Sequence, residues 1–331
     1  MRRRTFIAGL GSAAAWPVVA RAQQGERIRR VGVLWYGTGN NDPQVQPLVA
    51  AFRVELGKLG WAEDHNLRMD YRFDGGDPIR RLTYAEELVN LGPDVIFAFT
   101  GPSARAAQRA TQVIPIVFVG AGDAADNKFV DRIARPAGNM TGFANVSTSL
   151  GGKWLQLLKE AVPPIARVGD IFNVDGTPGL EAVNLQTVID AAADQLAITI
   201  VKMPVRDPVE IDRMINAFAA EPNGGLLLTG ASLLANFQAL CQASLKYRLP
   251  LMYGGAGIVA EGLLMSHGPN IVDLIRGAAS YIHLVLRGTK PSNLPIQYPT
   301  KFQLIVNLKT AKALGLTIPE TLLATADEVI Q

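Results

Sequence analysis

The stretch that decides the fold runs from Val95 to Gly120 and reads VIFAFTGPSARAAQRATQVIPIVFVG. It contains a short apolar run, a Thr-Gly-x-Ser turn, a helical stretch, a proline and a second apolar run that ends in glycine. About 130 residues later, Leu226–Gly255 repeats this order as LLLTGASLLANFQALCQASLKYRLPLMYGG. Short apolar runs that alternate with helical stretches are typical of β-α-β units in a parallel sheet. The repeat therefore predicts an α/β protein with two similar lobes.

The Thr-Gly-x-Ser turns, Thr100–Ser103 and Thr229–Ser232, directly follow apolar runs in both copies. Open α/β sheets bind their ligands at the carboxyl ends of the strands. The two turns are therefore predicted to face a ligand held between the lobes. The alternative is that glycine and serine are common in the βα turns of any doubly wound protein, in which case the repeat describes the fold alone.

The pattern of apolar and polar residues extends this organisation over most of the chain. Strands are expected at Ile28–Trp35, Leu67–Phe73, Val95–Phe99, Ile116–Val119, Val168–Phe172, Ile198–Met203, Leu226–Leu228, Leu251–Tyr253, Gly262–Ser266 and Phe302–Val306. Helices are expected at Pro47–Leu59, Arg80–Leu91, Leu150–Ala161, Leu180–Leu196, Ile211–Ala219, Asn236–Tyr247 and Val272–Leu286, with a helical tail after the last strand. Strands and helices alternate, as a doubly wound fold requires.

Residues 1–22 have the features of an export signal. Three arginines at positions 2 to 4 precede a weakly apolar run rich in alanine and glycine, and Ala20-Arg21-Ala22 supplies the small-x-small pattern of a cleavage site. We expect cleavage after Ala22 and a mature chain that begins at Gln23. The order Arg3-Arg4-x-Phe6-Ile7 is similar to a twin-arginine signal, although no lysine follows it, so the Sec route remains open. Either route leads to the periplasm.

Composition excludes several classes of partner. The net charge is +3, but four arginines lie in residues 1–22, and without them the charge is −1. A near-neutral chain with no basic run lacks the electrostatic footprint of a nucleic-acid-binding protein. The apolar run of the signal is too short to span a membrane. The only cysteine, Cys241, lies far from the cleavage site, so no lipid anchor is expected; we expect Cys241 to be a buried apolar residue.

Five stretches carry a family resemblance. They are the carboxyl-terminal LPIQYPTKFQLIVNLKTAKALGLTIPETLLATADEVIQ, and AFRVELGKLGWAEDHNLRMDYRF, IPIVFVGAGDA, RPAGNMTGF and EGLLMSHG. With them, essentially the whole mature chain resembles the tryptophan/tyrosine-type substrate-binding proteins of bacterial ABC transporters. The resemblance implies a type I periplasmic-binding fold, in which two Rossmann-like lobes joined by three crossovers hold a ligand in the cleft between them. It places residues 27–141 and 266–295 in lobe 1, and residues 142–265 and 296–331 in lobe 2.

The resemblance also implies a function. The chain would be a monomeric periplasmic subunit that captures a small amino acid or aromatic acid and delivers it to the permease and ATPase of an importer. Neither catalysis, a cofactor nor a metal is implied. Tryptophan binders of the family tend to have a His-Pro loop after the first strand, whereas this chain has Tyr36–Asp42 there. The resemblance therefore implies the family, and it leaves open whether tryptophan is the ligand.

A ligand carboxylate is expected at Thr100, Gly101 and Ser103. A helix begins there, and its first turn offers unsatisfied backbone N–H groups and a partial positive charge. Glycine lets a ligand approach the backbone, and the hydroxyls add donors. Ser103 could equally serve as the helix cap. Asp123 matches the family's Gly-Asp pair and could bind a ligand ammonium group, or it could be an ordinary turn aspartate.

Further candidate contacts lie at strand ends on both sides of the cleft. Trp35, Tyr36 and Tyr253 offer flat aromatic faces for an aromatic or apolar ligand body, although each could instead belong to a core. Additional hydrogen bonds to the ligand could come from Asn145 and Asn173, and from the second turn through Thr229, Gly230 and Ser232.

Enzyme classes lack their motifs. Gly37-Thr38-Gly39 follows a strand, but Asp42 stands in place of the third glycine of a dinucleotide fingerprint, and neither a P-loop nor a nucleophile elbow occurs. The three histidines, His65, His267 and His283, lack metal-ligand spacing, and of these His267 is the one that could reach the cleft. The alternatives to an importer subunit are a ligand-sensing subunit for a membrane receptor and, with less support, a secreted hydrolase.

Overall fold

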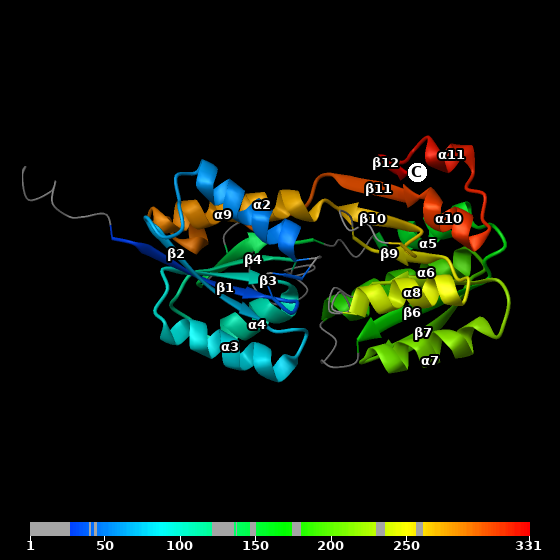
Figure 1. Ribbon diagram of the computed structural model, residues 1–331, viewed down its shortest axis with the longest axis horizontal. Coiled ribbons are helices and arrows are strands. Elements are labelled where there is room, and N and C mark those ends of the chain that lie inside the picture. Colours follow the sequence, from blue (N-terminus) through cyan, green and yellow to red (C-terminus); the bar gives the residue numbers. More distant parts are fainter. Residues whose placement is uncertain are drawn as a thin grey trace, which may run out of the picture.

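The computed structural model describes residues 27–39, 41–42, 45–120, 136, 138–145, 150–173, 180–229, 236–255 and 261–331. Within these ranges the chain forms two α/β lobes that lie side by side, each built on its own sheet (Figure 1). The expected signal peptide (residues 1–22), Asp123, Gly230 and Ser232 lie outside the described residues, as does the side chain of Asn173.

Lobe 1 is built on a parallel sheet with the order β2-β1-β3-β4-β5. Its strands are β1 (Arg29–Trp35), β2 (Leu67–Phe73), β3 (Val95–Phe99), β4 (Ile116–Val119) and β5 (Met140–Phe143). One face is covered by α2 (Gln46–Lys58) and α9 (Ile271–Leu286), and the other by α3 (Pro78–Asn90) and α4 (Gly101–Ala110) (Figure 1).

Lobe 2 is built on a sheet with the order β12-β11-β10-β9-β8-β6-β7, in which only the β10–β11 pair is antiparallel among the described strands. Its strands are β6 (Arg167–Asn173), β7 (Thr199–Val205), β8 (Gly224–Leu228), β9 (Leu251–Tyr253), β10 (Met265–Pro269), β11 (Phe302–Asn307) and β12 (Glu328–Ile330). Its helices are the packed pairs α5 (Leu150–Ala161) with α6 (Leu180–Gln195) and α7 (Pro208–Ala219) with α8 (Phe237–Lys246), followed by the short α10 (Leu308–Leu314) and α11 (Glu320–Leu323). No helix of the described ranges is long and apolar enough to cross a membrane.

The strand orders confirm the predicted duplication. In lobe 2 the order β7-β6-β8-β9 repeats the order β2-β1-β3-β4 of lobe 1. The two Thr-Gly-x-Ser turns follow β3 and β8, which are equivalent strands in this scheme. Helix α3 after β2 therefore corresponds to α7 after β7.

Three connections join the lobes: from β5 to α5, from β10 to α9, and from α9 through a 3-10 turn at Pro291–Asn293 to β11. The expected boundaries were wrong by a few residues. The return to lobe 1 comes after Pro269 rather than at Ser266, because β10 pairs with β9 and β11 of lobe 2. Strand β5 continues to Phe143, so the boundary expected after residue 141 moves toward the carboxyl end. Phe143 also forms a bridge to Gln297, so the boundary expected after residue 295 moves in the same direction.

The carboxyl-terminal tail also differs from the expectation of a helix throughout. After α10 and α11, Glu328–Ile330 forms β12, which lies parallel to β11 at the edge of the sheet. Three residues are too few to display a period of two. Pairing with β11 therefore decides the conformation of this segment.

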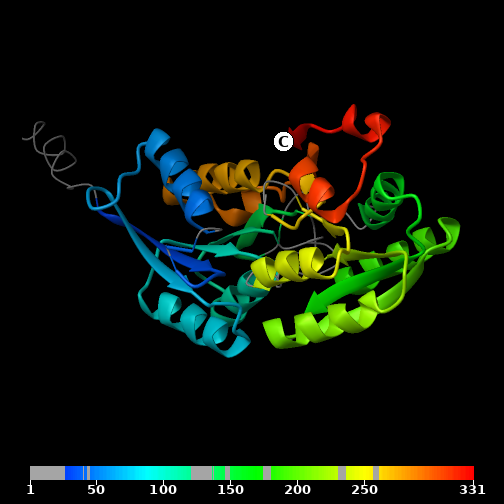
Figure 2. The same cartoon turned by 45° about the vertical axis from the view of Figure 1, so that its right-hand side comes forward.

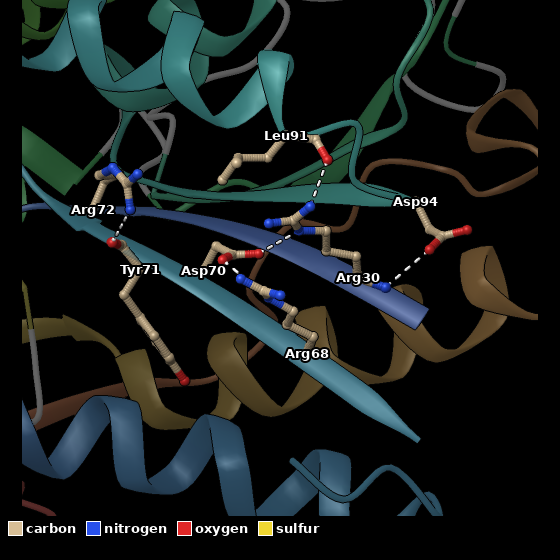
Figure 3. A network of polar contacts seen from close by, with 7 residues as sticks. All are labelled: Arg30, Arg68, Asp70, Tyr71, Arg72, Leu91 and Asp94. Carbon is tan, nitrogen blue, oxygen red and sulfur yellow. Dashed lines mark hydrogen bonds and ion pairs between the residues drawn. The ribbon is translucent and has the colours of Figure 1, made fainter. Parts of the chain in front are cut away.

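Strand β2 forms the outer edge of the lobe 1 sheet and is lined with charges (Figure 3). Arg68 and Arg30 both form ion pairs with Asp70. Arg30 also donates to the Leu91 carbonyl, and its backbone N–H donates to Asp94. Charged side chains on an edge strand discourage pairing with a strand of another chain. We interpret this network as protection of the sheet edge.

Candidate functional site

The carboxyl ends of the two sheets meet at the boundary between the lobes. Tyr36 follows β1 and Phe99 ends β3 in lobe 1, whereas Tyr253 ends β9 in lobe 2. All three belong to, or pack against, one cluster of buried apolar residues that includes both lobes. Because residues from both lobes meet in this cluster, we place the candidate site there.

Thr100 joins β3 to α4 in a backbone conformation that is rare for a residue with a side chain. Its φ is 90° and its ψ is 155°, a conformation that costs on the order of 1–3 kcal/mol outside glycine. The Thr100 N–H donates to the Val119 carbonyl at 2.8 Å, and its hydroxyl lies 3.2 Å from the Ser103 hydroxyl. Strained backbone is concentrated at functional sites. Nothing in the sequence signals this strain.

Ser103 is not the cap of α4, because the N-cap residue of that helix is Thr100. Its side chain has no exposed surface, and its N–H points to the Thr100 hydroxyl at 3.5 Å. Gly101, the first residue of α4, is also buried. The cap role considered for Ser103 therefore belongs to Thr100, and the Ser103 hydroxyl contacts the Thr100 hydroxyl within the turn.

Gly120 and Asn145 complete the lobe 1 side of the site. Gly120 follows β4 with a φ of 76°, and a Cβ placed on it would lie 3.6 Å from Asn145 Nδ2 and 3.7 Å from Thr100 Cα. The ends of β3, β4 and β5 therefore bring Thr100, Gly120 and Asn145 together. Asn145 was expected at the site from its position after a strand. Gly120 was not predicted as a site residue, although the stretch Val95–Gly120 ends on this glycine.

The Tyr36 hydroxyl is buried without a hydrogen-bond partner among the described residues. The side chain is 5% exposed, and its ring stacks on Phe99 with 5.4 Å between the ring centroids. Burial raises the pKa of Tyr36, and the nearby Tyr253 and Asp42 raise it further. Tyr36 is therefore a neutral donor at the boundary between the lobes, and no acceptor for it occurs in the part of the chain that the structure describes.

Tyr253 is the aromatic residue that lobe 2 contributes. It is half-buried and packs edge-on against Phe237, with the centroids 5.8 Å apart. Burial raises its pKa to about 12, so this phenol is also neutral. The expected pair of tyrosines, one from each lobe, thus lies close together.

Trp35 does not share this position and is a correction to the expected site. Its side chain is 0% exposed and stacks on Phe99, with 4.7 Å between centroids, and lies edge-on to Phe52 of α2. Successive side chains of a strand point to opposite faces, and Val31, Val33 and Trp35 share the face under α2. Trp35 therefore belongs to the core of lobe 1.

The second Thr-Gly-x-Ser turn has a different anchor. The Thr229 hydroxyl donates to Asp170 of β6 at 3.1 Å. Asp170 is buried, and burial raises its pKa, while Lys202 at 3.7 Å and the Thr229 hydroxyl oppose that rise. The Thr229 side chain is thus held by the protein itself, and Asp170 is a structural partner that the sequence did not reveal. Asn173 ends the same strand as Asp170.

No cluster of three metal-ligating side chains occurs among the described residues. His267 lies in β10 and stacks on Phe302; burial lowers its pKa, and Lys153 lowers it further. His283 accepts a hydrogen bond from the Trp61 indole at 3.1 Å. Cys241 is buried as expected, and burial raises its pKa to about 12.

Comparison with known proteins agrees with this architecture. Residues 43–330 match the family model described as ABC transporter substrate binding protein. The chain belongs to this family. Substrate-binding proteins of ABC transporters are periplasmic or extracytoplasmic, bind small molecules and interact with the permease. The family resemblance drawn from the sequence is confirmed.

Individual relatives are distant. A tyrosine-binding protein of Clostridioides difficile is 22% identical over 277 residues, which cover 83% of this chain and 78% of that protein. A Streptococcus pneumoniae ABC domain in complex with L-Trp has a TM-score of 0.81 at 21% identity, covering 91% of this chain and 99% of that one. A conserved domain protein of Vibrio cholerae also has a TM-score of 0.81, at 24% identity, covering 92% of this chain and 100% of that one. The structural likenesses show the shared fold.

Proposed function

We propose that this protein is the solute-binding subunit of an ABC importer and that it captures a small carboxylate-bearing ligand with an aromatic body. The ligand lies between the lobes, with its body against Tyr36 and Tyr253 and its carboxylate at the first turn of α4. The lobes close on it by hinge motion at the three connections. Lobes that are joined by only a few segments can rotate relative to each other about those segments. The protein releases the ligand unchanged to the permease.

The observation that carries this proposal is the Tyr36 hydroxyl. It is buried close enough to Tyr253 for that residue to raise its pKa, and it has no partner among the described residues. A buried hydroxyl without a partner costs about 1–3 kcal/mol. A ligand that supplies an acceptor would remove this cost.

The first turn of α4 supports the carboxylate. The Thr100 backbone is strained, and Gly120 keeps the space beside Thr100 and Asn145 free of a side chain. Helix starts favour anions by about 0.3–1 kcal/mol when exposed, and up to ~2 when partly buried. The tyrosine-binding relative and the complex with L-Trp favour an aromatic amino acid as the ligand. Asp123 would then be the candidate partner of its ammonium group.

The proposal includes export and assembly. Residues 1–22 direct the chain to the periplasm by the twin-arginine or the Sec route, and cleavage after Ala22 releases a monomer without a membrane anchor. The protein then works with a permease and an ATPase. Export of a form that still contains Arg21 at its amino terminus would contradict the cleavage site.

A thermal-shift series tests the ligand class. L-Tyrosine at about 100 times its dissociation constant should stabilise the native state by roughly 2.7 kcal/mol, which appears as a shift of several degrees. Tyramine, which lacks the carboxylate, should bind at least about tenfold more weakly, because a bond to a charged group contributes about 1.5–3 kcal/mol. The analogue 3-(4-hydroxyphenyl)propionate lacks the amine and isolates its contribution.

Two outcomes would contradict the proposal. If tyramine binds as tightly as L-tyrosine, the carboxylate is not recognised. If chromatography of the incubated ligand shows a new product, the protein is a hydrolase or another enzyme rather than a binding subunit.

A further inference from the structure

Two exposed aliphatic side chains occupy equivalent positions in the two lobes. Ile79 in the first turn of α3 is 79% exposed, and Val209 in the first turn of α7 is 77% exposed. Each follows an Asp-Pro pair whose aspartate caps the helix. Asp77 accepts from the N–H groups of the two residues after its proline at 2.8 and 3.1 Å, and Asp207 does so at 2.9 Å in both bonds.

Neither residue is required by the fold at its position. The first turn of a helix favours acidic and other polar residues, because they complement the helix dipole, and β-branched side chains have lower helix propensity. Among the described residues, few large apolar side chains are as exposed as these two. Their matched placement after equivalent strands therefore indicates a contact with something outside the chain.

The position of the pair is set by the sheet order. The connections between the lobes leave from β5 of lobe 1 and from β10 and β11 of lobe 2, whereas β2 and β7 lie at the opposite edges of their sheets. Helices α3 and α7 follow these far strands and lie along one side of the molecule, away from α9, in both views (Figures 1 and 2). Strands β2 and β7 end at the boundary between the lobes, so the first turns of α3 and α7 lie on either side of that boundary. A hinge motion of the lobes would change the distance between these two turns most.

The charges beside the pair describe the partner surface. Arg80 follows Ile79 directly, and Arg206 precedes the cap of α7; both side chains are at least half exposed. They lie 3.8 Å from Asp77 and 3.3 Å from Glu210 respectively, which orients the two guanidinium groups at the surface. A complementary surface would present an apolar depression with a carboxylate at its rim, once for each lobe.

We propose that Ile79 and Val209, each with its neighbouring arginine, form a two-part docking surface for the outward-facing side of the permease. This inference rests on the proposed function. A partner can respond to loading only if it binds the empty and the loaded forms with different affinity. Because the spacing between the two contacts changes when the lobes close, a permease that engages both selects the loaded form.

The test uses cells whose own copy of the protein carries Ile79→Ser, Val209→Ser or both, and it measures the initial rate of uptake of labelled L-tyrosine. Val113→Ser is the matched control, because Val113 is 86% exposed in the turn between α4 and β4, at the far end of lobe 1. Binding of L-tyrosine by each purified variant is measured in parallel and should stay within twofold of wild type. Substitutions at such exposed positions also leave stability nearly unchanged.

We expect each single variant to lower uptake roughly threefold to tenfold, the effect of losing one buried aliphatic contact, and the double variant to lower it more than tenfold. Val113→Ser should match wild type. If wild-type cells show uptake and the double variant equals Val113→Ser, the docking surface is wrong while the proposed function stands. If cells without the protein take up L-tyrosine as fast as wild-type cells, the proposed function is wrong, and this inference is wrong with it.

Discussion

The two Thr-Gly-x-Ser turns have the same sequence pattern and the same place in their lobes, but different physical roles. In lobe 1, Thr100 has a φ of 90° and its hydroxyl contacts Ser103 within the turn. In lobe 2, the Thr229 hydroxyl reaches to the next strand and donates to the buried Asp170. Duplication therefore preserved where the turn lies, while the neighbouring residues decide what its hydroxyl does. The strained turn is the better candidate for the ligand.

The largest effect is expected where the lobes meet. Tyr253→Ala should weaken binding of L-tyrosine by about 2–4 kcal/mol, because a buried aromatic contact at the centre of an interface is lost. Isothermal titration calorimetry measures this change. Tyr247→Ala is the matched control in lobe 2, since Tyr247 bonds to Asp212 outside the site. Equal affinity in the two variants would place the ligand away from Tyr253.

Thr229→Val tests the anchor of the second turn. The variant should lose about 1.5–3 kcal/mol of stability near neutral pH, because a hydrogen bond to a buried carboxylate is removed. In the wild-type protein the hydrogen bond from Thr229 lowers the pKa of Asp170. Without this bond the pKa of Asp170 rises further, and the folded form with an ionised Asp170 is destabilised. Below the ordinary aspartate pKa of about 3.9 the carboxyl is protonated in both states, so the difference should shrink there.

Urea unfolding of wild type and Thr229→Val at pH 7 and at pH 3.5 gives both numbers. A loss of stability that is equal at the two pH values would mean that the Thr229 hydroxyl does not act through Asp170. A change in affinity for L-tyrosine larger than the change in stability would instead make Thr229 a ligand contact.

Thr100→Gly should have the smallest effect on stability. Glycine adopts a positive φ freely, so relief of about 1–3 kcal/mol of strain offsets the lost cap, which contributes about 0.5–2 kcal/mol. Thr229→Gly removes the hydrogen bond to Asp170 and should be clearly destabilising in the same urea titration. If Thr100→Gly is the more harmful of the two, the strain assigned to the first turn is absent in solution.

Most of the fold could be predicted because its signals are local. The apolar runs of β3 and β4 and the helix Leu150–Ala161 have the expected bounds. The errors lie where pairing overrides local sequence. Gly268 and Pro269 are typical of a turn, but antiparallel pairing with β11 holds them in β10, and pairing alone makes Glu328–Ile330 a strand.

The candidate site was predicted less completely, because it depends on which face a side chain takes. Trp35 and Tyr36 are neighbours in the chain, yet one lies in the core and the other at the boundary between the lobes. A shift of one residue in the end of β1 would exchange them. The link between Asp170 and Thr229 spans 59 residues, and no spacing in the sequence predicts it.

The most direct test of the proposed ligand site is the pair of free energies measured for Tyr36→Phe. Removing this hydroxyl, which has no partner among the residues that the structure describes, should leave the free energy of unfolding of the ligand-free protein unchanged or higher. The same change should weaken L-tyrosine binding by about 0.5–1.5 kcal/mol, the value of one hydrogen bond. Urea titration and calorimetry on one preparation give both quantities. An unchanged dissociation constant would contradict a ligand held between the lobes at Tyr36.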